Sequence, residues 1–384
     1  MAQPIPKRIK EQNPTLEMKP YNTLLIDGSN LLEVCFRACK QISTTGKNMG
    51  GVFEFLLQVK LMLRKGNFRH VYVFFDGVNS GQLRYNELPE YKANRDKSFN
   101  DENLSDYMKQ VNAIVKNMMT KTAKNSKTVD EFEDFANQRE VLISCLEELF
   151  CRVVMCDETE ADDFIGYYVA NKEPNERIVI ISNDRDLTQL IADDVAVYVQ
   201  SMKEFITPKN HVEKMGYSHE NVLLKKVICG DVSDNIKGIK GVGEKTLFTN
   251  FPEFISRKVT LDEVIDKARL INEERKNEKK PPLKWAENIV NKVTDGVQGD
   301  RIYEINEKII DLKNPLMTDE AKELMDSFMH TPMDPEDRSV SNLYSIIRDN
   351  GISELMDEGK FASFFVEYQY IALSEKKFFD ESTK

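Results

Sequence analysis

The sequence predicts an α/β fold with a mostly parallel central sheet, helices on both faces of that sheet, and a helical C-terminal domain. The first observation is that short apolar runs of strand length alternate with longer segments whose apolar residues recur at helical spacing. The second is that strand-like runs end near residue 205, while helical spacing continues to the end. At 384 residues, the chain has room for two compact units.

The elements follow in chain order. The run TLLID at 23–27 ends in an acid and a turn, as a buried parallel strand does. Residues 52–66 carry apolar side chains at helical spacing and stop at a glycine, and the next apolar run lies at 70–77. Together these three segments predict a βαβ unit. Further helices are expected at 131–150 and 160–172, and further strands at 151–157, 177–184 and 195–200.

The predicted domain boundaries are a flexible arm at 1–20, an α/β domain at 21–205 and a helical domain at 206–384. Within the first domain, about 81–130 is too long for a simple connection and predicts an arch or lid. This arch has a stretch without acids that carries five lysines, Lys109, Lys116, Lys121, Lys124 and Lys127. The polar segment 272–285 in the second domain is expected to be a loop.

Composition narrows the classes of function. The formal net charge of −11 argues against a basic coat over the whole surface, so an anionic partner would meet a local basic patch. No apolar run approaches the ~20 residues of a membrane span, and the first 20 residues lack the apolar core of a secretory signal, so an intracellular protein is expected. The six cysteines form no CxxC pair and are expected to be reduced thiols. With only four histidines, carboxylates are left to carry the chemistry.

Acids cluster at the predicted turns. They are Asp27, Asp76, Glu160, Asp162, Asp163, Asp184, Asp186, Asp231 and Asp234. Three of them follow predicted parallel strands, whose carboxyl ends meet in one crevice. On helices, Glu160 with Asp163, and Asp231 with Asp234, would share a face. So many carboxylates repel one another unless cations lie among them, and Mg²⁺ or Mn²⁺ prefers such oxygen ligands. The alternative for any single aspartate is an ordinary helix cap.

The motifs LLIDGSN, FFDG, YKANRD, EADDF, ISNDRDLTQL and GDVSDNIKGIKGVG occur in this order over about residues 21–250. In that order and spacing, the chain resembles the flap endonuclease and 5′-3′ exonuclease superfamily, with the greatest likeness to the ribonuclease H of tailed phages. This resemblance implies a PIN/5′-nuclease-like sheet, a helical arch, and a helix-hairpin-helix type motif at about 230–250.

The resemblance also implies roles for single residues. The nine acids would hold two Mg²⁺ ions, with Mn²⁺ as a substitute, and Asp162 and Asp184 would be essential for catalysis. Asp27, Asp76, Glu160 and Asp162 would lie nearest the first ion and the other five around the second. Lys92 and Arg95 would share a helical face and steady the scissile phosphate. Tyr91 is expected either to stack on an unpaired base or to lie on an ordinary solvated helix face.

The segment IKGIKGVGEKT resembles the hairpin turn of this superfamily. Gly238, Gly241 and Gly243 would let the backbone approach a nucleic-acid phosphate, and relatives hold a K⁺ ion in this turn. Lys237, Lys240 and Lys245 would add non-specific, salt-sensitive binding. The alternative is a glycine-rich connection between helices without a ligand.

The sequence and the resemblance together predict a Mg²⁺-dependent 5′ nuclease, a phosphodiesterase that removes RNA primers or DNA flaps during replication by a two-metal mechanism. The expected partners are 5′-ended or branched DNA and RNA/DNA duplex, together with a single-strand-binding protein and a sliding clamp. The expected state is a monomer in the cytoplasm, that of the host if the chain is phage-encoded. The alternative is a non-catalytic binder of branched DNA. A PIN-type ribonuclease is a third possibility, but such proteins are usually shorter than this chain.

Near the C-terminus, Phe378 and Phe379 are expected to pack on the last helix rather than dock on a clamp.

Overall fold

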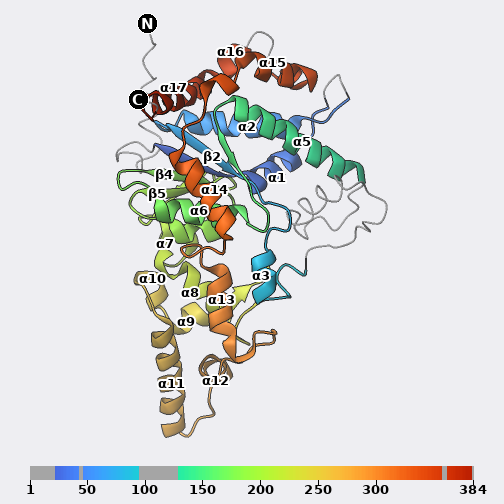
Figure 1. Cartoon of the computed structure of the whole chain (residues 1–384). Coiled ribbons are helices and arrows are strands. Elements are labelled where there is room, and N and C mark those ends of the chain that lie inside the picture. The colour runs from blue at the N-terminus through green and yellow to red at the C-terminus, as the bar shows by residue number, and fades with distance from the viewer. Residues whose placement is uncertain (1–21, 43–45, 95–128, 357–360, 383–384) are drawn as a thin grey trace.

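A six-stranded sheet forms the centre of the fold (Figure 1). The computed structural model describes residues 22–42, 46–94, 129–356 and 361–382. The strands lie in the order β3-β2-β1-β4-β5-β6, and all neighbours are parallel except β5 and β6. Their bounds are β1 (Thr23–Asp27), β2 (His70–Phe74), β3 (Arg152–Val154), β4 (Ile178–Ile181), β5 (Val195–Val199) and β6 (Glu204–Ile206). The predicted fold class and the five predicted strands are confirmed, and β6 is a short addition that the sequence analysis missed.

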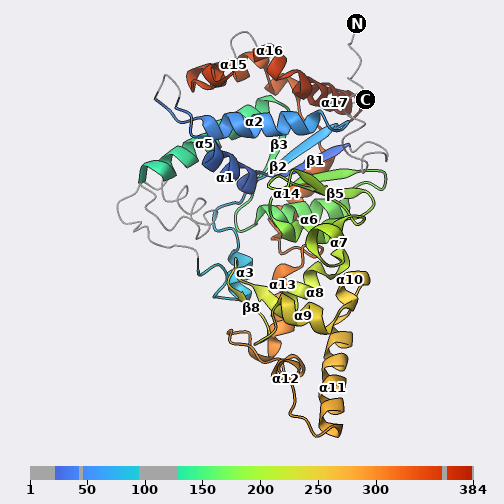
Figure 2. The same ribbon diagram turned by 180° about the vertical axis from the view of Figure 1, so that it is seen from behind.

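One face of the sheet is covered by α1 (Gly28–Ala38), α2 (Gly50–Leu63) and α5 (Val129–Glu148). Alternate strand residues such as Leu24, Ile26 and Val73 are fully buried against these helices. Further out, α15 (Val340–Asp349), α16 (Phe361–Phe364) and α17 (Val366–Ser382) lie over α2 and α5 (Figures 1 and 2). Their apolar residues join the same core, because Ile347, Phe365 and Ile371 are buried in it.

The opposite face is covered by α6 (Ala161–Asn171) and α14 (Asp319–His330), as both views show (Figures 1 and 2). Here Leu25, Phe74 and Ile180 point to the other side of the strands and pack with Phe164 of α6. A six-residue 3₁₀ helix, Arg185–Leu190, follows β4 and belongs to this layer.

The helical part extends from one side of this unit (Figure 1). It comprises α7 (His211–Met215), α8 (Val222–Cys229), α9 (Glu244–Asn250), α10 (Glu253–Ser256), α11 (Leu261–Asn277), α12 (Lys284–Val290) and α13 (Ile302–Ile310), with the small hairpin β7 (Gly230–Asp231) and β8 (Ile236–Lys237). Leu247, Phe254 and Ile289 are fully buried in its core. The prediction of a loop over 272–285 was wrong at both ends, because α11 runs to Asn277 and α12 begins at Lys284.

The last helices return to the α/β unit. Glu375 of α17 is buried and forms an ion pair of 2.6 Å with Arg152 of β3, and it also hydrogen-bonds His70 of β2 at 2.8 Å. The rings of Phe378 and His70 are in edge contact, with centroids 5.8 Å apart, which agrees with the packing interpretation of Phe378. The domain boundary at residue 205 stays a prediction, but helices α14, α15 and α17 of the predicted second domain pack against the α/β unit. No helix in the described part of the chain has both the length and the apolar composition to cross a membrane.

Two sequence predictions fall outside the described residues. They are the N-terminal arm at 1–20 and most of the arch, including its five lysines and Arg95. At the start of the arch, α3 (Gln82–Glu87) leads into a series of turns that reaches residue 94.

Candidate active site

Acids from separate strands meet at the carboxyl edge of the sheet, as predicted. Asp27 is the last residue of β1 and the N-cap of α1, where its carboxylate accepts hydrogen bonds from the Asn30 amide at 3.0 Å and the Ser182 hydroxyl at 2.8 Å. Asp184, just beyond β4, accepts one from the Asp186 amide at 2.8 Å. The capping alternative is therefore true of both residues, and the hydrogen bonds fix the orientation of both carboxylates.

Asp76 and Asp162 complete the centre of this edge. The Asp76 carboxylate accepts a hydrogen bond of 2.9 Å from the backbone amide of Ala161, so the end of β2 is tied to the start of α6. Burial raises the pKa of Asp162 well above its ordinary value, and the neighbouring carboxylates of Asp184, Asp27, Glu160 and Asp76 raise it further. One aspartate thus lies in the field of four acids from different elements.

The pKa of Asp27 is raised for the same reasons as that of Asp162, namely burial and neighbouring carboxylates. It is raised to about 7, first by burial and then by Asp76 and Asp184. Hydrogen bonds from Asn30 and Ser182 oppose this rise. A carboxylate with such a pKa binds a proton at neutral pH unless another cation takes its place.

Glu160 is surrounded by donors. Its carboxylate accepts a hydrogen bond of 2.9 Å from the Tyr91 hydroxyl, pairs with Arg84 at 2.8 Å and also pairs with Lys92. Tyr91 is only 2% exposed, and its ring packs edge-on against Tyr85. Neither of the predicted positions for Tyr91 is found: the ring faces the acids, with no open face for a base and no solvated surface.

Asp163 has a different partner from the one that the resemblance implied. Both of its oxygens pair with the Arg84 guanidinium, at 2.5 and 2.9 Å, and the Leu316 amide donates a third hydrogen bond at 3.2 Å. Arg84 also donates to the Ile309 carbonyl at 2.9 Å. Burial raises the pKa of Asp163 even though Arg84 opposes the rise. Asp163 therefore belongs to a buried ion pair that joins α3, α6 and α13.

The remaining acids gather around Lys226 of α8. Its ammonium pairs with both Asp186 and Asp231. Burial and Asp184 raise the pKa of Asp186 to about 7 despite Lys226, whereas Lys226 and hydrogen bonds from Ser233 outweigh burial and bring the pKa of Asp231 to about 2. Sequence reasoning missed Lys226, although its place five residues before Asp231 on an amphipathic helix was visible.

Asp231 and Asp234 were expected on one helix, and this expectation was wrong. Asp231 ends the short strand β7, and Asp234 lies in the turn that leads to β8. The hairpin nevertheless brings both to the small cavity that Glu160, Asp162 and Asp186 also line. Their common location is therefore a product of the hairpin.

Lys92 lies in a turn and not on a helix. Its φ is +50°, and its backbone amide donates a 2.8 Å hydrogen bond to the Asp234 carbonyl. The helical face that Lys92 and Arg95 were expected to share is not present at residues 89–94. The Lys92 ammonium still reaches the acidic edge, because it pairs with Glu160 and lies 4.8 Å from the Tyr91 ring centroid.

Arg139 of α5 is a further cation that the sequence analysis missed. It is 8% exposed and donates to the Asp76 carbonyl oxygen at 3.2 Å, next to the acidic edge. Burial lowers its pKa to about 10, and the Asp76 carboxylate opposes the change. Only the fold brings it beside Asp76, 63 positions away in the chain.

The donor set at this edge consists of hard carboxylate oxygens with protein cations among them. Among the described residues, no three His, Cys, Asp or Glu side chains stand close enough together to form a ready-made metal cage. Asp27, Asp76, Asp162 and Asp184 nonetheless share one electrostatic site, and their oxygens suit Mg²⁺ or Mn²⁺. The chemistry of the donors therefore fits divalent ions, with Asp163 as the exception.

The glycine-rich hairpin turn predicted from the resemblance lies at 238–243, between β8 and α9. Gly241 has a φ of +78° and, like Gly243, has open space where a side chain would point. Gly238 differs, because a Cβ there would lie 2.2 Å from the Cys229 backbone, so this glycine is needed for packing within the protein. Lys237 and Lys245 are exposed, whereas Lys240 pairs with Asp295 at 2.7 Å.

The fold and this edge define an α/β protein of the 5′-nuclease class, with acids beyond the parallel strands and a helical hairpin unit beside them. The chain belongs to the family described as 5′-3′ exonuclease, N-terminal resolvase-like domain, whose model matches residues 22–216.

Curated relatives include whole polymerases and a smaller nuclease. DNA polymerase I of Mycobacterium tuberculosis is 31% identical over 254 residues, and that of Bacillus subtilis is 27% identical over 247 residues. Each match covers 63% of this chain and 24% of the polymerase, so the chain spans about a quarter of their length. A 5′-3′ exonuclease of Buchnera aphidicola is 25% identical over 248 residues, which cover 64% of this chain and 74% of that protein.

Solved structures share the fold. A zinc-bound 5′-exonuclease of phage T5 has a TM-score of 0.54 at 18% identity, and the match covers 86% of this chain and 98% of that one. A T5 flap endonuclease in a complex with DNA and metal ions has the same score and identity, over 86% and 97%. These matches agree with the predicted fold class.

Proposed function

We propose that this protein is a Mg²⁺-dependent 5′ nuclease that hydrolyses phosphodiesters in RNA primers or DNA flaps during replication. The observation that carries the proposal is the position of Asp162 within the field of Asp27, Asp76, Glu160 and Asp184. Such a concentration of acids destabilises the fold unless cations are bound there. Family membership and the T5 flap endonuclease complex with DNA and metal ions support the same reading.

Two groups of acids would hold the ions. Asp27, Asp76 and Asp162, with Glu160 beside them, would form the first group, and Asp184, Asp186, Asp231 and Asp234 the second. When bound, the two ions supply an activated water and charge stabilisation for the departing oxygen. Mn²⁺ is expected to substitute for Mg²⁺, because it takes similar oxygen ligands.

The protein's own cations would act on the substrate phosphate. The Lys92 ammonium points at the acidic edge from one side and Lys226 from another. A substrate phosphate that binds between Lys92 and Lys226 would lie close to both ammonium groups. These would stabilise the negative charge that builds up on the phosphate in the transition state. Arg84 is committed to Asp163 and Glu160, so its role is to position Glu160.

The hairpin unit would hold the duplex portion of the substrate. Lys237 and Lys245 are exposed beside the open turn at Gly241 and Gly243, and they would make non-specific phosphate contacts. Binding of K⁺ at this turn, contacts with a single-strand-binding protein and a sliding clamp, and a monomeric state in the cytoplasm stay predictions from the resemblance.

The test uses matched, 5′-labelled flaps with an RNA or a DNA 5′ strand. With Mg²⁺ the wild type should shorten the label, and Asp162→Asn and Asp184→Asn should each slow this by at least about a hundredfold while binding changes little. Asp300→Asn, at an exposed site in the helical part, serves as the control. A flap that is shifted on a gel but never cut would instead identify a non-catalytic binder of branched DNA. Undiminished cleavage in excess chelator would refute metal dependence.

A further inference from the structure

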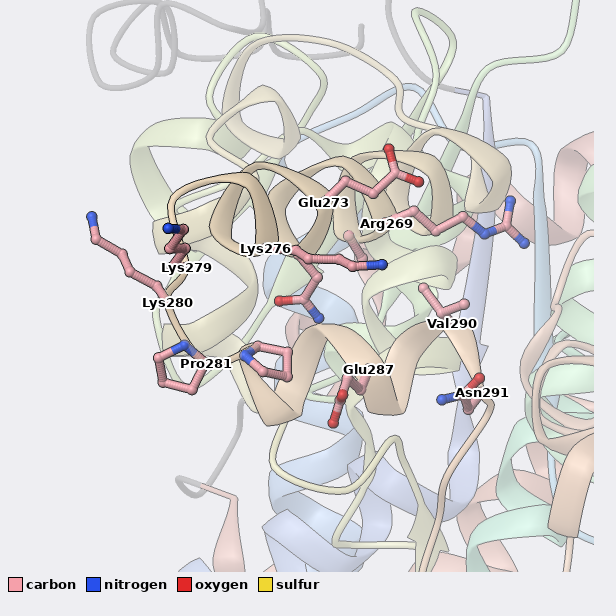
Figure 3. A pocket seen from close by; sticks show the side chains of 12 residues that line it. Arg269, Glu273, Lys276, Lys279, Lys280, Pro281, Glu287, Val290 and Asn291 are labelled. Carbon is pink, nitrogen blue, oxygen red and sulfur yellow. The ribbon is translucent and has the colours of Figure 1, made fainter.

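A groove lies between α11 and α12, at the tip of the helical part (Figures 1 and 3). Its cavity volume is about 820 Å³. This volume is within the ~300–1,000 Å³ of typical sites for small molecules and is sufficient for a few residues of a peptide. The groove is separate from the acidic edge, because none of its lining residues lines the cavity at Asp162.

Cations dominate the groove in a chain whose net charge is −11. Four of its lining residues are basic, Arg269, Lys276, Lys279 and Lys280, against two acids, Glu273 and Glu287. Figure 3 shows Lys276 extending from α11 into the space above α12, with Lys279 and Lys280 at one end of the groove. Arg269 pairs with Asp266, and Lys280 with Glu278. Within the described part of the chain, Lys276 and Lys279 have no ion-pair partner, so their charge is available to a ligand.

The remaining lining is apolar or aliphatic. Ala268, Pro281, Pro282 and Val290 contribute hydrocarbon surface, and none of the described residues that line the groove is aromatic. A single nucleic-acid strand would therefore lack the stacking platform that such strands use. The evenly spaced phosphates of such a strand would also lie next to Glu273 and Glu287, which repel them. A peptide with separate carboxylates and an apolar side chain between them matches this surface better, because the carboxylates can pair with lysines and the apolar side chain can lie on hydrocarbon.

The groove is built before any ligand arrives. Asn272 of α11 and Leu283 exchange two hydrogen bonds of 2.7 and 3.2 Å across the turn, and Arg275 donates to the Pro281 carbonyl at 2.8 Å. The start of α11 has a capping box formed by Thr260 and Glu263. A preformed groove loses little conformational freedom on binding, which favours measurable affinity even for a short peptide.

We propose that this groove binds a short acidic peptide segment of a partner protein. Carboxylates of the peptide would pair with Lys276 and Lys279, and apolar side chains would lie on Pro281 and Pro282 at one end of the groove and on Val290 at the other. This interaction is additional to the proposed nuclease function and does not depend on it.

The groove is connected to the hairpin turn at 238–243 through α12. Asn288 of α12 donates a 2.8 Å hydrogen bond to the Lys240 carbonyl, and the Lys240 amide donates to the Val293 carbonyl at 2.8 Å. The hairpin turn is therefore fixed to the helix that forms one wall of the groove. A partner held in the groove would be tethered beside the hairpin without covering the acidic edge.

The test measures binding of a fluorescein-labelled peptide of alternating aspartate and leucine, about six residues long, by fluorescence polarisation. The full-length wild type should bind it, and the double variant Lys276→Glu, Lys279→Glu should bind at least about tenfold more weakly. The matched control is Lys376→Glu, Lys377→Glu on α17, where both lysines are exposed as well, and it should bind as the wild type does. A peptide with serine in place of leucine should bind more weakly to the wild type.

Equal peptide affinity for the wild type and the groove variant would overturn the proposal. If the groove variant then also loses affinity for flap DNA, the groove is a nucleic-acid surface instead. Because the assay needs no cleavage, a failure of the nuclease proposal leaves its result intact.

Discussion

Arg84 shows how a single buried cation decides which acids are free to bind a ligand. It takes both oxygens of Asp163 and one side of Glu160, and it is 5% exposed. The motif EADDF suggested Asp163 as a member of the ion-binding set, but α3, 79 positions earlier, supplies its partner. Such a pairing is invisible in a local motif because it depends on how α3 packs against α6.

Removing the Arg84 guanidinium should destabilise the folded protein. Arg84→Met leaves Asp163 buried without a counter-charge, so the free energy of unfolding should fall by about 3–5 kcal/mol. Adding Asp163→Leu should restore most of it, because no charge is then left unpaired. Urea unfolding in chelator measures both values. A small change in the single variant, with a further loss in the double variant, would contradict this account.

The raised pKa values of Asp27 and Asp186 predict a pH dependence for the metal-free protein. Both are about 7, against an ordinary value of 3.8, so between these pH values the folded state holds protons that the unfolded state has released. The free energy of unfolding should therefore fall as the pH rises from about 4 to about 7. Asp27→Asn should flatten this fall. Urea unfolding in chelator across this range is the measurement, and identical slopes for wild type and variant would contradict the assignment.

Among the elements, α17 is an example of what the sequence left open. Phe378 and Phe379 were expected to pack on the last helix, but periodicity does not say which surface such a helix meets. In the structure it lies over α2 and is anchored by Glu375 on Arg152 and His70. These partners are more than 200 positions away in the chain. The strands were easier to predict, because their apolar runs and terminal acids are local features.

The anchor of α17 can be tested apart from the active site. Glu375→Gln leaves Arg152 buried without its counter-charge and should lower the free energy of unfolding by about 3 kcal/mol. His70 and Arg152 are the first residues of their strands, whereas the acids follow the carboxyl ends of the strands, so the contacts of Glu375 lie away from the acids. The cleavage rate at saturating Mg²⁺ and substrate should therefore stay as in the wild type. Glu381→Gln, at an exposed 3.7 Å pair with Lys377, should change neither quantity and serves as the control.

At the scale of the whole molecule, an acidic edge with a few buried cations among its carboxylates lies next to a surface that carries exposed lysines. The acidic edge lies beyond the strands, and exposed lysines of the hairpin lie beside it on the helical part. The sequence predicted both the acids and the lysines of the hairpin turn, and their order along the chain, because both lie in contiguous motifs. It did not predict Lys226 among the acids, or that Gly238 serves internal packing, because both facts depend on where α8 meets the hairpin.

The exposed lysines beside the acidic edge predict a defined salt dependence of substrate binding. Replacing Lys237 and Lys245 with alanine should weaken flap DNA binding and lower the slope of log affinity against log salt by about 2, one for each lost phosphate contact. Cleavage of bound substrate should be little changed. The control is the pair Lys376→Ala and Lys377→Ala on α17. An unchanged slope in the hairpin variant would remove the hairpin from the substrate interface.

The central claim is that the carboxylates at the edge of the sheet converge to hold divalent ions. Calorimetric titration of the metal-free protein with Mn²⁺ tests it most directly, using wild type, Asp162→Asn and Asp163→Asn. The account predicts about two ions bound to the wild type, an affinity at least about tenfold weaker in Asp162→Asn, and near wild-type binding in Asp163→Asn, whose carboxylate is committed to Arg84. Equal binding by wild type and a folded Asp162→Asn would contradict the claim.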